Sequence, residues 1–296
     1  MAAGCRRGFK RAYPRLDALV VLTGRDRRRY ERLLDHQTPV FVIPNTIRSD
    51  VGGAAPLRGT TVLAAGRLTR QKGFDKLVRA FAQVAPDHPE WRLVICGDGP
   101  WRRRLERLIA RHGLEHAVSL PGPVEPLATA MDDAALFVLS SRFEGFPLVL
   151  IEAMAKGLPV VAFDCPTGPA EIIDDHRDGL LVPRGNVDRL AGGMRELMED
   201  AALRRRLGAA AHGTARGYTI EAVGPLWEAL LEQLWTRGGS RELGSRDGYA
   251  SAARASSSSR SRALRVIEAA RSNSARASSP RPSRASRSPR TLGSRW

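Results

Sequence analysis

The sequence predicts an α/β protein, built on a Rossmann-like, doubly wound parallel sheet with C-terminal helices and a disordered tail. Short apolar runs alternate with helical patterns between Thr60 and Val182, which is typical of a parallel sheet covered on both faces. Glycine-containing turns follow four of the predicted strands, at Gly66, Gly97, Gly122 and Gly145. In open α/β sheets such turns lie at the carboxyl edge of the strands, where ligands bind.

The predicted elements follow one another along the chain. An arginine-rich helix at 24–35 lies between two short strands, at 16–23 and 40–43. Strands are then predicted at 61–65, 92–96, 118–120, 136–139, 159–163 and 180–182, with helices at 74–85, 101–111 and 147–156. Three helices without intervening strands follow at 187–199, 200–212 and 219–235. We expect Gly224-Pro225 to kink the last helix or to delay its start.

The positive charge is concentrated at the end of the chain. Residues 237–296 hold 14 Arg against 3 acidic residues and therefore carry +11 of the net charge of +16. This segment is rich in Ser and poor in apolar residues, so we expect it to be disordered. Only four of the 47 basic residues are lysines, so the number of arginines alone is a poor indicator of function.

Several classes of site are disfavoured by the sequence. The three cysteines, Cys5, Cys96 and Cys165, are far apart, which argues against disulfides and structural zinc. No Asp-x-Asp motif, no run of 18 apolar residues and no apolar signal segment occurs. We therefore expect a cytoplasmic protein with no metal site.

A cationic turn is predicted to face a helix N-terminus. Arg67 and Lys72 lie on the turn after strand 61–65, and Gly145 and Phe146 precede the helix that begins at Pro147. Together these groups suit a diphosphate, although two solvated basic residues are the alternative interpretation. Glu152 lies among apolar residues of that helix, where a charge requires a partner.

These motifs together resemble the retaining glycosyltransferases of the GT-B fold, and specifically glycosyltransferase family 4. The resemblance covers residues 16–235 and rests on Gly66-Arg67 with Lys72-Gly73, Gly97-Asp98-Gly99-Pro100, Glu144-Gly145-Phe146-Pro147 and Glu152-Ala153-Met154-Ala155-x-Gly157. The segment from Cys165 to Ile173 further resembles bacterial members that build surface polysaccharides.

The resemblance implies transfer of a sugar from a UDP- or GDP-linked donor, without a cofactor or metal. Its catalytic residues would be Arg67 and Lys72, which neutralise the leaving diphosphate, and Glu144, which contacts the transferred sugar. The donor-binding residues would be Gly66, Pro123 and Val124 at the nucleobase side, the amides of Gly145 and Phe146, and Glu152 at the ribose.

A complete GT-B enzyme has two Rossmann-like domains, so the resemblance also divides the chain. Residues 1–45 would be a remnant of the N-terminal domain, 46–236 the donor domain and 237–296 the tail. We therefore expect weak or no transferase activity from this chain alone and an under-paired strand at 16–22. Trp227, Leu231 and Trp235 would be exposed, which favours self-association or a complementing N-terminal domain.

The expected partners are a nucleotide-sugar and an acceptor that is a glycan, a lipid-linked sugar or a small molecule. Peripheral contact with the inner face of the membrane is compatible with this interpretation, whereas binding of nucleic acid by the basic tail is less favoured. Three alternatives stay open: a non-catalytic nucleotide-sugar-binding module, a tail-mediated nucleic-acid binder, and another GT-B enzyme such as a sugar-nucleotide epimerase.

Overall fold

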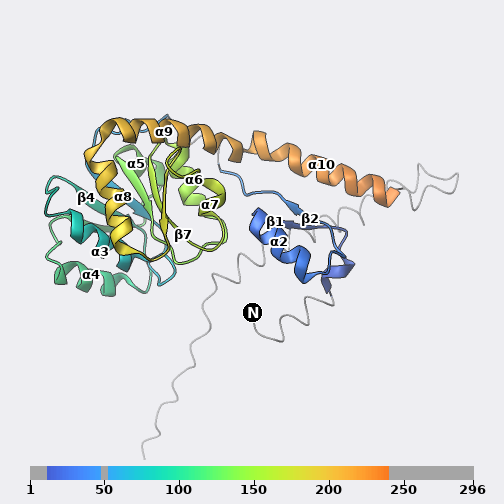
Figure 1. Cartoon of the computed structure of the whole chain (residues 1–296), viewed down its shortest axis with the longest axis horizontal. Helices are drawn as coiled ribbons and strands as arrows, with labels where there is room; N and C mark the ends of the chain where they lie inside the picture. The colour runs from blue at the N-terminus through green and yellow to red at the C-terminus, as the bar shows by residue number, and fades with distance from the viewer. Residues whose placement is uncertain (1–11, 48–52, 240–296) are drawn as a thin grey trace, which may run out of the picture.

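The computed structural model describes residues 12–47 and 53–239 (Figure 1). The predicted tail lies outside the described residues from position 240 onward, as do the first eleven residues of the predicted N-terminal remnant. Two units are joined in the described part: a six-stranded α/β domain and a small unit that contains a two-stranded sheet.

The larger unit is a six-stranded parallel sheet in the order β5-β4-β3-β6-β7-β8. The chain starts in the middle with β3, moves outward to β5, then returns to lay β6 on the other side of β3. This reversal is the mark of a doubly wound sheet, so the predicted fold class is confirmed. The strands are β3 (Thr61–Ala65), β4 (Arg92–Cys96), β5 (Val118–Gly122), β6 (Leu136–Leu139), β7 (Val160–Asp164) and β8 (Leu180–Pro183).

Two apolar cores lie on opposite faces of this sheet. Along β3, Val62 and Ala64 face one core while Leu63 and Ala65 face the other, because successive side chains of a strand alternate. The first core is covered by α3 (Phe74–Val84), α4 (Arg102–Arg111) and α8 (Val187–Glu199). The second is covered by α5 (Leu127–Asp132), α6 (Leu148–Ala155), α7 (Pro169–Ile172) and α9 (Ala201–Ala215).

The smaller unit contains β1 (Leu19–Val21) and β2 (Val40–Val42), a parallel pair connected through α2 (Gly24–Leu33). The final helix, α10 (Ile220–Gly239), leaves the larger unit and packs across this pair (Figure 1). Val223 and Leu230 of α10 are buried there against Ala18, Val20 and Ile43. The N-terminal segment is therefore attached to the rest of the chain largely through the last helix.

Several local predictions need correction. The first strand covers 19–21 rather than 16–23, although it is under-paired as expected, with β2 as its only partner strand among the described residues. Pro225 lies inside α10, so it does not delay the start of that helix. Trp227 is half-buried against the β1–β2 pair, whereas Leu231 and Trp235 are exposed as predicted. No described helix has both the length and the apolar character needed to cross a membrane.

A side chain from the larger unit caps the helix of the smaller one. The carboxylate of Glu171, on α7, accepts from the backbone amides of Gly24 and Arg25 at 2.5 and 2.8 Å. These amides begin α2 and have no acceptor within the helix, and the helix dipole favours an anion there. Glu171 thereby links the two units.

Replacing Glu171 with Ala is expected to accelerate hydrogen exchange at the Gly24 and Arg25 amides by about fivefold, because a capping interaction contributes about 1 kcal/mol. Hydrogen exchange followed by NMR checks this, with Glu115→Ala as the control, since Glu115 is also exposed but caps no helix. Unchanged rates at both amides would show that the linkage is not significantly populated in solution.

Candidate functional site

The candidate site lies where the strand order reverses, between β3 and β6. The turn at 66–73 follows β3 and the turn at 140–147 follows β6, and these two strands are direct neighbours. Ligands of open α/β sheets bind at this position, outside the carboxyl ends of the strands. Two sequence motifs more than 70 residues apart are thereby placed side by side.

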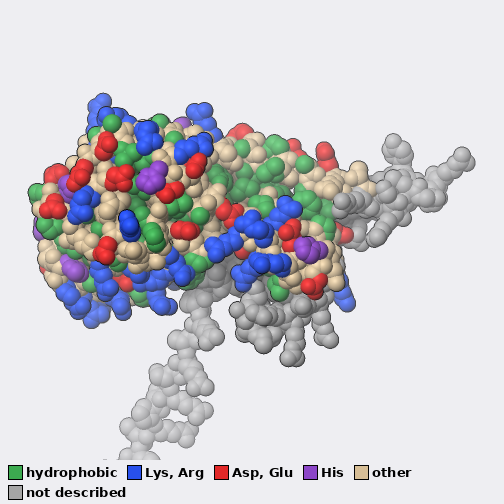
Figure 2. All heavy atoms as spheres, viewed as in Figure 1, with side chains coloured by type: hydrophobic (Ala, Val, Ile, Leu, Met, Phe, Trp, Pro, Cys, Tyr) green, Lys and Arg blue, Asp and Glu red, His purple; other side chains and the backbone are tan. Residues whose placement is uncertain are grey.

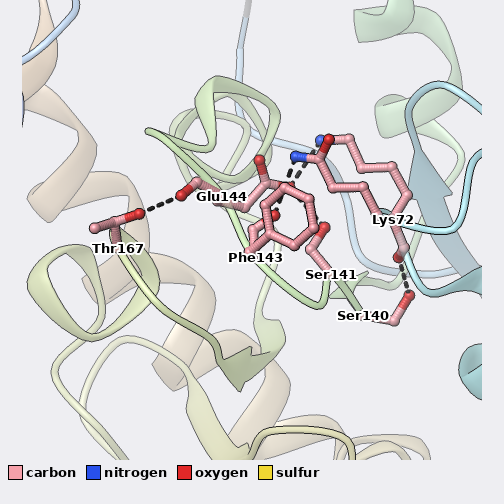
Figure 3. A network of polar contacts seen from close by, with 7 residues as sticks. Lys72, Ser140, Ser141, Phe143, Glu144 and Thr167 are labelled. Carbon is pink, nitrogen blue, oxygen red and sulfur yellow. Dashed lines mark hydrogen bonds and ion pairs between the residues drawn. The ribbon is translucent and has the colours of Figure 1, made fainter. Parts of the chain in front are cut away.

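An ion pair joins the two turns. The Lys72 ammonium donates to Glu144 Oε1 at 2.8 Å, and the two side chains are 19% and 6% exposed (Figure 3). Ser141 Oγ donates to the same oxygen at 2.6 Å. The resemblance implies a phosphate as the partner of Lys72 and a sugar as the partner of Glu144, and both roles stay predictions; in the structure the two side chains bind each other. The physical reason is that a buried carboxylate requires a compensating charge.

The backbone keeps the two turns in close contact. Ser140 Oγ donates to the carbonyl oxygen of Lys72 at 2.9 Å, and Gln71 Nε2 donates to the carbonyl oxygen of Phe143 at 3.1 Å. Gly73 has a φ of +67°, and a Cβ there would overlap the carbonyl oxygen of Ser140. Only glycine therefore permits this approach, which sets the position of Lys72.

A second ion pair lies directly behind the first. The guanidinium of Arg142 binds both carboxylate oxygens of Asp75, at 2.9 and 2.7 Å, and donates to the carbonyl oxygen of Arg70 at 2.6 Å. Burial raises the pKa of Asp75, but the hydrogen bond and charge of Arg142, together with the charge of Arg79, outweigh it and lower that pKa overall. Arg142 thus connects the turn after β6 to the turn after β3 and to the first residues of α3.

A third turn, after β7, also forms hydrogen bonds with Glu144. Thr167 donates its hydroxyl to the carbonyl oxygen of Glu144 (Figure 3). The amide of Glu144 donates to the carbonyl oxygen of Pro166 at 3.2 Å. Burial and the neighbouring Glu144 charge raise the pKa of Cys165 to about 12, so this thiol stays protonated at neutral pH. Glu144 is therefore held through both its backbone and its side chain.

Glu152 is placed differently from Glu144. It lies on α6, half-buried, and no described residue donates a hydrogen bond to its carboxylate. Burial raises its pKa, because removal from water disfavours the charged form. An ionisable group that is desolvated without a partner is a candidate for contact with a ligand.

The start of α6 offers hydrogen-bond donors as well. Pro147 is the N-cap residue and supplies no side-chain cap, and the amides of Gly145 and Phe146 have no acceptor among the described residues. Gly145 itself is exposed. The N-terminus of a helix with free amides is suited to an anion.

The remaining predicted residues lie on the same edge of the sheet. Arg67 is exposed on the turn after β3, and the side chain of Lys72 lies along Gly66, where a Cβ would approach its Cε to 3.1 Å. Pro123 and Val124 directly follow the edge strand β5; Pro123 is exposed and Val124 is half-buried. Every predicted site residue is thus on one edge, and an ion pair joins two of them, Lys72 and Glu144, directly.

Sequence reasoning missed the residues that position the site. These are Gln71, Asp75, Ser141, Arg142 and Thr167, which fix the turns around Lys72 and Glu144. Ser141 and Arg142 lie close in sequence to the predicted site turn at Glu144, so this closeness could have indicated that they contact the site. The pairing of Arg142 with Asp75 had no local signal, because the two positions lie 67 residues apart.

The sheet order and the turns where it reverses define a doubly wound, Rossmann-like domain. The chain belongs to the family described as glycosyl transferases group 1, which matches residues 50–214. That range includes all of the site residues named above.

Two of the similar proteins bear the names of bacterial polysaccharide proteins. The chain is 42% identical over 226 residues to the exopolysaccharide phosphotransferase SCO2592 of Streptomyces coelicolor, covering 76% of this chain and 24% of that protein. It is 35% identical over 171 residues to the amylovoran biosynthesis glycosyltransferase AmsD of Erwinia amylovora, covering 57% of this chain and 47% of that one.

Solved structures show the same fold. The pneumococcal O-GlcNAc transferase GtfA, solved with UDP and GlcNAc, matches with a TM-score of 0.68 and 25% identity. The match covers 77% of this chain and 47% of that one. The chain thus spans less than half the length of each of these three proteins.

Proposed function

We propose that this chain carries the donor site of a retaining, metal-independent glycosyltransferase of family 4, which takes a UDP- or GDP-linked sugar. One observation carries the proposal: three groups lie together where the strand order reverses. They are Lys72, the free amides before α6 and the unpartnered carboxylate of Glu152. A cation and helix amides suit a diphosphate, and a carboxylate suits the two hydroxyls of a ribose. Residues 46–236 would form this donor domain.

The proposed role of Lys72 is to neutralise the diphosphate as it leaves. An ammonium has three donors, and the pair with Glu144 occupies one of them, so phosphate oxygens can bind the others without breaking the pair. Arg67, on the same turn, would add a second cation, and the amides of Gly145 and Phe146 would bind the same phosphates. Preorganised charges of this kind stabilise a leaving group without requiring a metal.

The proposed role of Glu144 is to orient the transferred sugar. Its Oε1 accepts from both Lys72 and Ser141, while no described residue donates to Oε2. That oxygen is free to accept from a sugar hydroxyl. We do not assign Glu144 as a covalent nucleophile; instead, the leaving phosphate would accept the proton of the acceptor hydroxyl on the same face of the sugar, which retains configuration.

The acceptor side of the reaction belongs to the same proposal. The relatives named above point to an acceptor in surface polysaccharide synthesis, which would be a glycan or a lipid-linked sugar, and lipid-linked acceptors would place the protein at the inner face of the membrane. The exposed apolar residues of α10, Leu231 and Trp235, would then face a complementing domain or a second copy of the chain.

A thermal-shift panel of nucleoside diphosphates and nucleotide-sugars tests the donor proposal. We expect stabilisation by UDP or GDP compounds and none by the corresponding nucleosides, because the diphosphate supplies most of the contacts. Ligand binding without sugar transfer to any acceptor would assign the non-catalytic module instead. No stabilisation by any of the compounds would refute the donor site.

Replacing Glu152 with Gln is expected to change binding and stability in opposite directions. Losing the carboxylate should weaken UDP or GDP binding by about tenfold, the effect of one charge-assisted hydrogen bond of about 1.5 kcal/mol. The free protein should become slightly more stable at pH 7. Burial raises the pKa of Glu152, so its ionisation costs stability as the pH rises through and above 4.5, and glutamine removes that cost.

Calorimetric titration and thermal unfolding of the free protein check both effects, with Glu106→Gln as the control. Glu106 is exposed on α4 and is not part of the site. A loss of stability in E152Q, or unchanged affinity, would show that Glu152 has an ordinary structural role.

A further inference from the structure

Four of the six residues that line a cavity outside the donor site are arginines. The cavity has a volume of about 290 Å³ and lies between α3 and α4. Arg79 comes from α3, while Arg104, Arg107 and Arg111 come from one face of α4, at helical spacings of three and four residues. Figure 2 shows basic side chains gathered along the edge of the molecule where α4 lies in Figure 1.

The four positive charges around the cavity face a single carboxylate. None of them forms an ion pair with a described residue, whereas Arg102, on the same helix, is paired with Asp98 and Glu106 at 3.3 and 3.5 Å. The only acidic residue that lines the cavity is Asp75, and Arg142 already occupies both of its oxygens. The convergence of these groups, and not the number of arginines in the chain, therefore makes this cavity electropositive.

Two of the four side chains are held in place. The Arg104 guanidinium stacks over the ring of Trp101, 4.7 Å from its centroid. Arg107 Nε donates to the carbonyl oxygen of Arg103 at 3.3 Å, which leaves its terminal nitrogens for other acceptors. Like charges oriented toward one cavity repel one another unless an anion lies between them.

We propose that this cavity is a second binding site, separate from the donor site, for a ligand that carries two or more phosphate charges. Arginine forks match phosphate oxygens in geometry and bind them in pairs. The volume is at the lower end of the range for small-molecule pockets, which suits a phosphorylated group rather than a whole nucleotide-sugar. The phosphates can belong to a soluble compound or to the headgroup of an anionic lipid.

Calorimetric titration of the full chain with inorganic pyrophosphate tests this site. UDP is present at saturating concentration, so that pyrophosphate bound in the donor site is not counted. We expect Arg107→Gln/Arg111→Gln to bind pyrophosphate at least tenfold more weakly than the unmodified chain. The matched control, Arg103→Gln/Arg189→Gln, removes two exposed arginines that do not line the cavity and should stay within twofold.

The arginine-rich segment after residue 239 is the same in all three proteins, so only the differences between them are informative. Equal affinities in the three proteins would overturn the proposal. If the double variant does not fold, Arg79→Gln supplies the same comparison from the other helix. A failure of UDP to bind would count against the donor site alone. The difference in pyrophosphate affinity between Arg107→Gln/Arg111→Gln and the control variant would still be measurable.

Vesicle sedimentation identifies the source of the phosphate. Selective loss of binding to cardiolipin vesicles in Arg107→Gln/Arg111→Gln, in addition to the loss of pyrophosphate affinity, would assign a lipid headgroup, because cardiolipin carries two phosphates; phosphatidylcholine vesicles are the blank. A difference with pyrophosphate but not with vesicles would assign a soluble phosphate compound. No difference in either measurement refutes the site.

Discussion

Replacing Lys72 with Met is expected to weaken UDP or GDP binding on the order of 100-fold. Two charge-assisted hydrogen bonds to phosphate oxygens, each contributing about 1.5 kcal/mol, account for this factor. The variant should also lose about 3 kcal/mol of stability, because Glu144, with its side chain 6% exposed, loses its counter-charge. Calorimetric titration and urea unfolding measure the two effects separately.

The double variant Lys72→Met/Glu144→Gln separates the two effects further. It should recover most of the stability, since no buried charge is left unpaired, but it should not recover the affinity. The matched control is Lys76→Met, because Lys76 donates to the carbonyl oxygen of Gly185 at 2.8 Å and lies outside the proposed site. If affinity returns together with stability in the double variant, Lys72 acts through the fold and not on the phosphates.

Replacing Arg142 with Met is expected to lower the free energy of unfolding by about 3 kcal/mol at pH 7, because Asp75 remains buried without its partner. The turn at 66–73 also loses the hydrogen bond that Arg142 donates to the carbonyl oxygen of Arg70. We therefore expect donor affinity to fall by roughly tenfold, about 1.4 kcal/mol. Arg142 is a positioning residue, since it contacts the turn and not the proposed ligand.

The pH dependence distinguishes this role from a general loss of packing. Arg142 lowers the pKa of Asp75, so the stability that the pair contributes is present above the unfolded value of 3.8 and is lost as the pH falls below it. Without Arg142, burial raises the pKa of Asp75, so the stability difference between the unmodified chain and R142M should begin to shrink above pH 3.8 and continue to shrink below it. A difference that is constant with pH would contradict the role of the ion pair.

The exposed pair of Arg177 and Asp174 supplies the control. Its nitrogen and oxygen are also 2.9 Å apart, but the side chains are 73% and 58% exposed. Arg177→Met should cost less than about 1 kcal/mol, because solvent screens such pairs.

The central strands of the larger unit were predictable because they are short apolar runs buried on both faces. The predicted limits of the strands at 61–65, 92–96 and 136–139 match the structure. The short helices α5 and α7, with six and four residues, were missed because they are too brief for a helical period to show. The helix does not start after Pro225, one of the two outcomes expected there, because burial of Val223 and Leu230 stabilises α10 despite the missing hydrogen bond.

The site was predictable at the level of turns but not of contacts. The motifs placed Arg67, Lys72, Glu144 and Glu152 on one edge of a parallel sheet, since every strand in such a sheet ends there. The pairing of Lys72 with Glu144 depends on β6 lying next to β3, which follows from strand order and not from local sequence. Long-range partners such as Asp75 were inaccessible for the same reason.

A crystal structure of the full chain with UDP tests the donor site most directly. The account predicts that the diphosphate lies between the ammonium of Lys72 and the amides of Gly145 and Phe146, with both ribose hydroxyls donating to the carboxylate of Glu152. UDP bound elsewhere on the molecule, or at this edge with its ribose turned away from Glu152, would contradict it.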